Sequence, residues 1–219
     1  MSCRSSNTAL LLFLLPALAA AATSEEELFF KSVSEVSDGE LRFLTQPPAK
    51  PVHHHQNRIT LDEASLSTGW VRLEQCHQHL DPVPSLQIVY NAERIRGLVI
   101  LVSDHIDRAW VQDNTVQMEG VRAQAKICIR GESRALSSDG TDRFSLANGP
   151  YLRRFLDGYY PMRVSMQVNL ATPRLRFEDI SPPPQPGFQV NVSADQVSYD
   201  AWFEGRLNTL IRFNSLGPE

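Results

Sequence analysis

The chain has 219 residues, of which 42% are hydrophobic and 21% charged, the balance of a globular protein rather than a disordered or collagen-like one. Its formal net charge of −4 excludes the basic surface of a nucleic-acid-binding protein. Its three cysteines are too few for a disulfide-dense miniprotein or a four-cysteine zinc site.

The first 22 residues have the pattern of a secretory signal peptide. Arg4 gives a positive start, Ala9–Ala19 is a leucine-rich apolar segment, and small residues up to Ala22 suit a signal peptidase. We expect cleavage before Thr23 and an exported protein, periplasmic or extracellular, without a transmembrane segment. The alternative is an uncleaved anchor, but the apolar stretch would span only about 21 Å as a helix, against roughly 30 Å of hydrocarbon.

The sequence predicts three segments: a signal peptide at 1–22, a leader at 23–57 and a single β-rich domain at 58–219. In the leader, Ser24 and Glu27 form a capping box ahead of a short helix at Glu25–Val36, although this segment equally suits a mobile leader. A proline-rich linker follows at Gln46–Pro51.

After the linker, apolar residues alternate with polar ones at the two-residue period of half-buried strands. The clearest alternation is Met162–Leu170. Similar patterns recur at Val71–Leu73, Val116–Met118, Ala125–Ile129, Phe188–Val192, Val197–Phe203 and Leu207–Phe213. Leu98–Val102 is apolar on both faces, which predicts a central strand.

A second short helix is expected where Pro150 can occupy the first helical position. Its apolar face would consist of Tyr151, Leu152, Phe155 and Leu156. The many short strands separated by turn signals nevertheless dominate. They predict an all-β fold, namely an antiparallel β-sandwich or a partly closed barrel, with one or two short helices.

Export leaves Cys76 and Cys128, an even pair that in an oxidising compartment predicts a disulfide rather than two buried free thiols. Each cysteine shares the phase of charged residues in its strand, such as Glu74 and Lys126. We therefore expect the bridge on an outer face or at a strand end rather than across the core, unless a bulge intervenes.

The sequence contains none of the common catalytic signatures: no G-x-S-x-G elbow, no phosphate loop, no dinucleotide turn and no H-E-x-x-H zinc helix. The adjacent carboxylates Glu178 and Asp179 would point to opposite faces of a strand. The chain therefore favours a binding protein over an enzyme, and neither catalytic residues nor a cofactor are assigned.

Five of the six histidines fall in two clusters, His53-His54-His55 and Cys76-His77-Gln78-His79. In an extended chain the first and third residues of each H-x-H unit share one face. Two such pairs side by side could hold copper or zinc, with Asp81 assisting. The same pattern also suits a solvated loop, so no residue is assigned as a metal ligand.

Two functions from different classes remain open. The first is an exported, non-enzymatic β-sandwich that binds a partner protein, a glycan or an envelope component. The second is an exported metal-binding protein that uses the histidine clusters His53-His55 and His77-His79. Neither implies a nucleic-acid partner. Asn191-Val192-Ser193 is a glycosylation sequon, which would be used only in a eukaryotic host.

Overall fold

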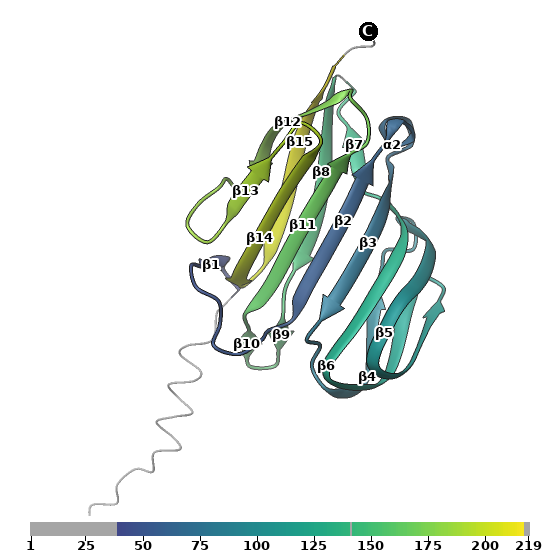
Figure 1. Ribbon diagram of the computed structural model, residues 1–219, viewed down its shortest axis with the longest axis vertical. Coiled ribbons are helices and arrows are strands. Elements are labelled where there is room, and N and C mark those ends of the chain that lie inside the picture. Colours follow the sequence, from purple (N-terminus) through teal and green to yellow (C-terminus); the bar gives the residue numbers. More distant parts are fainter. Residues whose placement is uncertain (1–38, 141, 217–219) are drawn as a thin grey trace, which may run out of the picture. The chain divides into compact units, whose positions relative to one another are not determined.

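The computed structural model describes residues 39–140 and 142–216, which form an all-β fold of two main sheets and a small hairpin (Figure 1). In spatial order the large sheet contains β1 (Arg42–Leu44), β14 (Gln196–Glu204), β11 (Met162–Leu170), β2 (His54–Leu61), β3 (Trp70–Gln78), β6 (Thr115–Arg134) and β4 (Val83–Val89). In addition, β13 (Gln189–Val192) pairs with β14, and β5 (Ile95–Gln112) pairs with β6. The sheet is mixed, because β2 and β11 run parallel.

The small sheet contains β12 (Leu175–Ser181), β15 (Leu207–Ser215), β8 (Arg143–Tyr151) and β7 (Leu136–Ser138), in that order. A two-stranded hairpin pairs β9 (Arg154–Phe155) with β10 (Gly158–Tyr159). The described helix α2 (Glu63–Thr68) has six residues, and the described part of the chain holds no helix long and apolar enough to cross a membrane.

One hydrophobic core joins the two main sheets. Val164 and Phe203 of the large sheet share it with Leu146, Ile211 and Phe213 of the small sheet, and all five are fully buried. Within the described residues both sheets remain open, so the fold is not a closed barrel. The expected domain start at residue 58 falls inside β2, whose eight residues pair with β3 and β11.

The alternation in β11 confirms the predicted phase of this strand. Met162, Val164, Met166, Val168 and Leu170 are all buried, whereas the residues between them are partly exposed. This pattern follows from the two-residue period of a strand that packs one face on the core.

Helix α2 was not predicted from the sequence. The Asp62 side chain accepts a hydrogen bond from the backbone N–H of Ser65, and the Ser65 hydroxyl accepts one from that of Asp62. Gly69 ends the helix with a φ of 75°, a conformation that glycine adopts without strain. The aspartate cap and the glycine were both visible in the sequence, but the helix is too short to show a hydrophobic period.

The helix expected to begin at Pro150 is wrong. Residues up to Tyr151 belong to strand β8, and the chain then forms the β9–β10 hairpin. Tyr151 is buried, whereas Leu156 is fully exposed and Phe155 is 46% exposed, so these residues do not share one apolar face. The predicted signal peptide and the predicted helix at Glu25–Val36 lie outside the described residues.

The segment Leu98–Val102 lies in an edge strand and not in a central one. Among the described strands β5 pairs only with β6, and β6 has β3 and β4 along its other side. The β5 register shifts three times, between Arg96 and Val99, Ile100 and Val102, and Asp104 and Ile106. Leu98 and Ile100 pack against a buried cluster, whereas Val99 and Leu101, which alternate with them, are about half exposed, at 45% and 46%.

Cys76 and Cys128 form a disulfide between directly opposite residues of β3 and β6, as predicted. Gln75 and His77 flank Cys76 and are buried at 8% and 6% exposure. Because successive residues of a strand face opposite ways, the bridge lies on the outer face of the large sheet, behind these two side chains.

Candidate functional site

The inner face of the large sheet changes from apolar to polar along β2 and β3. Ile59 and Leu73, which are register partners, belong to the main core. Moving along the same face, the next pair is Asn57 opposite Gln75, followed by His55 opposite His77. The polar residues therefore occupy positions that the strand period assigns to the interior.

Three imidazoles gather at this end of the face. The His55 and His77 ring centroids lie 4.3 Å apart, and those of His53 and His77 lie 5.2 Å apart. His53 Nε2 is 3.0 Å from His77 Nδ1, so one ring donates a hydrogen bond to the other. The H-x-H spacing of His53, just before β2, and His55, within it, together with the opposing position of His77 on β3, brings the rings together.

A chain of hydrogen bonds continues from the imidazoles across the interior. The Tyr90 hydroxyl donates to Gln75 Oε1 (2.5 Å), and Gln75 Nε2 donates to Asn57 Oδ1 (3.1 Å). Asn57 Nδ2 then donates to the Tyr151 hydroxyl of β8 (2.6 Å). His55 Nε2 joins this chain, 2.6 Å from Gln75 Nε2 and 3.0 Å from Asn57 Oδ1. These bonds fix the amides and hydroxyls in place.

A cavity of about 410 Å³ opens beside this network. We call it the histidine cleft, and its polar lining consists of His53, His55, Asn57, Gln75, His77, Tyr90, Ser133, Asn148 and Tyr151. Of the buried side-chain atoms without a hydrogen-bond partner in the described residues, two belong to this lining, His77 Nε2 and Asn148 Nδ2. An unpaired buried polar atom is costly. Both atoms belong to side chains that line the cleft, although each atom itself has almost no exposed surface.

The ionisable groups of the cleft are held uncharged. Burial lowers the pKa of His53 to about 4 and that of His55 to about 3, and it lowers the pKa of His77 well below 6.5. Burial raises the pKa of the Tyr90 and Tyr151 hydroxyls above their ordinary values. At neutral pH the lining therefore presents neutral imidazoles, amides and hydroxyls.

The remaining residues of the two histidine clusters lie elsewhere. His79 is exposed at the end of β3, with a φ of 54°. His54 faces the other side of the sheet, where its Nε2 lies 2.6 Å from the Ser165 hydroxyl. Asp81 forms a two-pronged ion pair with Arg153 (2.7 and 3.2 Å). The structure thus unites His53, His55 and His77 but leaves out the fourth imidazole.

The three imidazoles do not surround a common point. His55 Nε2 is turned toward Asn57 and Gln75, away from the His53–His77 contact. Within residues 39–140 and 142–216, no group of three or more histidine, cysteine, aspartate or glutamate side chains is arranged to hold one metal ion.

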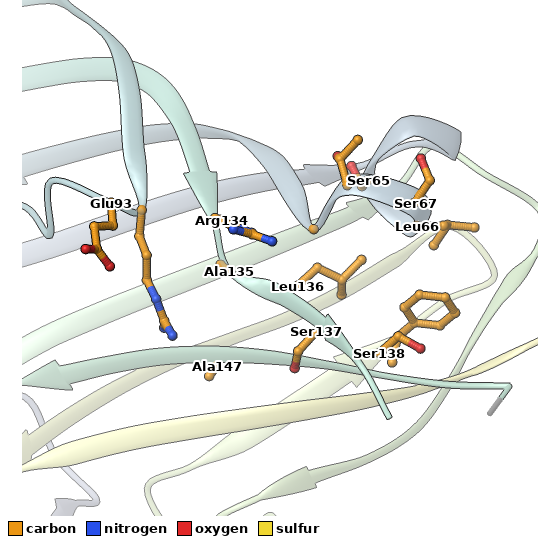
Figure 2. Close-up of a pocket in the computed structure, with 14 residues that line it drawn as sticks. Ser65, Leu66, Ser67, Glu93, Arg134, Ala135, Leu136, Ser137, Ser138 and Ala147 are labelled. Carbon is orange, nitrogen blue, oxygen red and sulfur yellow. The ribbon is translucent and has the colours of Figure 1, made fainter. Parts of the chain in front are cut away.

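A second cavity, of about 530 Å³, lies beyond the histidine cleft toward α2 (Figure 2). Its lining comes from α2, the β4–β5 connection and strands β6 to β8, and it shares Ala135 and Ala147 with the histidine cleft. Unlike that cleft it carries charged groups, Glu93, Arg94 and Arg134. No buried unpaired side-chain atom of the described residues belongs to its lining.

No protein-family model matches the chain, and no curated protein matches its sequence. The candidate site is therefore argued only from the geometry of its own residues. Sequence reasoning singled out the histidines but missed Asn57, Gln75, Asn148 and the two tyrosines. Gln75 and His77 carried a usable signal, since both share the phase of the buried Val71 and Leu73.

Proposed function

We propose that this chain is an exported, non-enzymatic binding protein whose ligand occupies the histidine cleft. The observation that carries the proposal is the pair of buried, unpaired atoms, His77 Nε2 and Asn148 Nδ2, that line one cavity. A ligand that bonds to both atoms would remove the cost of burying them. A cavity of this size, with apolar walls and a few fixed polar groups, is typical of small-molecule sites.

The chemistry of the lining supports binding over catalysis. The residues that line the cleft include no carboxylate, lysine, arginine or cysteine. The histidine pKa values of about 3 and 4 make these imidazoles weak bases, whereas an efficient general base has a pKa close to the working pH.

Export is part of the same proposal. The signal-peptide pattern and the disulfide between Cys76 and Cys128 both suit an oxidising compartment. Mass spectrometry of the exported protein should find a mature chain that begins near Thr23. A mature pool that keeps Met1 would contradict cleavage.

Native mass spectrometry of protein purified from its own compartment tests the binding site. We expect a non-covalent small-molecule adduct on the wild type. Ser133→Phe places a ring in the histidine cleft, whose lining includes Ser133 whereas that of the second cavity does not, and should remove the adduct. Ala194→Phe adds the same ring in the exposed β13–β14 turn and should keep it. An adduct that persists in Ser133→Phe would place the ligand outside the histidine cleft.

A transition-metal ion is the second candidate, favoured by the distance of 3.0 Å between His53 Nε2 and His77 Nδ1. Two metal–nitrogen bonds of about 2.1 Å would span this separation, in place of the shared proton. His55 would have to leave Asn57 and Gln75 to supply a third nitrogen.

Calorimetric titration with zinc or copper decides this second candidate. Saturable binding that His77→Ala abolishes and His79→Ala preserves would support it. Weak binding that is equally affected by both variants would indicate an adventitious surface interaction.

A further inference from the structure

The histidine cleft, the ligand site of the proposed function on which this inference rests, constrains the charge of its ligand. Its lining holds no ionised side chain at neutral pH, and the nearby Arg153 and Asp81 neutralise each other. A charged ligand would lose its hydration there without gaining a counter-charge, which is costly. A neutral ligand avoids this loss.

The hydrogen-bonding groups of the cleft constrain the ligand further. Asn148 Nδ2 has N–H groups to donate, and His77 Nε2 is a second unpaired atom. The Tyr151 hydroxyl accepts from Asn57, which leaves its own proton free to donate toward an oxygen of the ligand. The matching ligand carries several oxygens that can accept, with hydroxyls that can also donate.

Apolar groups supply the rest of the wall. Ile88 and Val89 of β4 line the cleft together with Pro150, Leu152 and Met162. Val89, a large apolar side chain of this lining, is 61% exposed. A ligand with polar edges and a C–H face would use both parts of the lining.

We infer that the ligand of the histidine cleft is a neutral carbohydrate of one or two sugar rings, held through its hydroxyl groups by His77, Asn148 and Tyr151. Sugar rings combine an uncharged skeleton, a high density of hydroxyls and apolar C–H faces. The site is ordered before binding by the hydrogen-bonded chain of Tyr90, Gln75, Asn57 and Tyr151. This order lowers the conformational entropy that the protein loses when the ligand binds.

Isothermal titration with matched sugars tests this inference on the full mature chain. The neutral probes are glucose, galactose, mannose, N-acetylglucosamine, maltose and lactose, and the charged counterparts are glucuronate, galacturonate and glucosamine. At least one neutral probe should bind with a Kd below about 10 mM. Its charged counterpart should bind at least about 10-fold more weakly, because its charge is unmatched.

Variants locate the site. Tyr151→Phe removes one hydroxyl and should weaken binding by about 3- to 10-fold, the usual effect of one lost hydrogen bond. Asn148→Leu should weaken it at least as much, and Asn191→Leu, in exposed β13, should leave it unchanged. Thermal melts accompany each titration. If Asn148→Leu fails to fold, the conservative Tyr151→Phe decides the result.

Each outcome has a meaning. Equal or tighter binding of the charged sugars would overturn the inference. Absence of sugar binding, with an adduct of another kind on the native protein, would overturn the carbohydrate and leave the cleft as a binding site. Absence of both sugar binding and any adduct would overturn the proposed function as well.

Discussion

His55 on β2 stands directly opposite His77 on β3, and their ring centroids are 4.3 Å apart. The residue next to His77 in the chain is Cys76, whose disulfide joins β3 to β6 on the other face of the sheet. Successive residues of one strand therefore supply the lining of the cleft and the covalent link behind it. The position of the His77 ring depends on the β2–β3–β6 register, which the disulfide holds.

Reduction of the disulfide should destabilise the protein substantially. The bridge closes a loop with a sequence separation of 52, for which chain-entropy arguments give about 4 kcal/mol. Urea unfolding of the wild type with and without reductant, compared with a Cys76→Ala/Cys128→Ala variant, measures the loss. Superimposable unfolding curves would contradict the bridge.

Acidification should destabilise the folded chain. His53, His54 and His55 have folded-state pKa values of about 4, 4 and 3, below the 6.5 of an exposed histidine, chiefly because they are buried. Between pH 6.5 and about 4 the unfolded chain binds more protons, so stability is fully present above pH 6.5 and is lost as the pH falls. Each buried histidine contributes a slope of roughly 1 kcal/mol per pH unit.

Unfolding free energies from pH 7.5 to 4.5 measure this slope. His77→Gln should reduce it, since the pKa of His77 is also lowered by burial. Asn191→Gln, which exchanges one non-titrating, exposed side chain for another, should leave the slope unchanged. A stability that does not vary over this pH range would contradict the buried, neutral imidazoles.

Val164→Asp should unfold the protein or cost several kcal/mol, since Val164 is fully buried in the shared core. The adjacent residue Ser165 is unsuitable as the site of a control substitution, because its hydroxyl forms hydrogen bonds with both His54 and Asp200. Asn214→Asp, on an exposed position of β15, is the better control and should stay within about 0.5 kcal/mol. Equal shifts in melting temperature would contradict the phase of β11.

Two glycines with positive φ angles offer a matched pair of variants. Gly69 (φ 75°) ends α2, and an added Cβ would lie 2.7 Å from the Leu136 carbonyl oxygen. Gly97 (φ 63°) has nothing within 4 Å of such a Cβ. Both alanine variants should lose about 1 kcal/mol from backbone strain, and Gly69→Ala should lose roughly 1–3 kcal/mol more from the clash. Equal losses of unfolding free energy in the two variants, measured by urea unfolding, would show that α2 can move away from the Leu136 carbonyl at no cost.

The strands could be predicted because their signals are local, and the disulfide because signal cleavage would leave Cys76 and Cys128 as an even pair. Alternation along Met162–Leu170 records which face packs on the core, and the phase of Cys76 placed the bridge outside. The parallel pairing of β2 with β11 has no such signal, because it depends on residues about 110 positions apart. Phe155 and Leu156 misled the helix prediction, since their apolar character suits a helix face as well as an exposed hairpin.

The candidate site could be predicted only in part. The H-x-H spacing pointed to imidazoles on one face, and the structure brings three of them together. Asn148 and Tyr151 reach the same cavity from β8 of the other sheet. The position of these two residues in the cavity depends on how the two sheets pack against each other. No spacing of residues in the sequence predicts that packing. His79 was included by its spacing, but the strand ends before its side chain can turn inward.

The broken register of β5 has a consequence for how copies of this chain behave at high concentration. A long apolar edge with free backbone donors and acceptors is a template on which another chain can add as a further strand, and growth of this kind leads to fibres. The shifts at Arg96–Val99, Ile100–Val102 and Asp104–Ile106 divide the first part of β5, up to Ile106, into pieces of a few residues. A strand of another molecule could pair in register with one piece, but it would be out of register with the next. The irregular backbone of β5 thus protects the chain from aggregation along an edge where the side chains of Val99 and Leu101 would favour it.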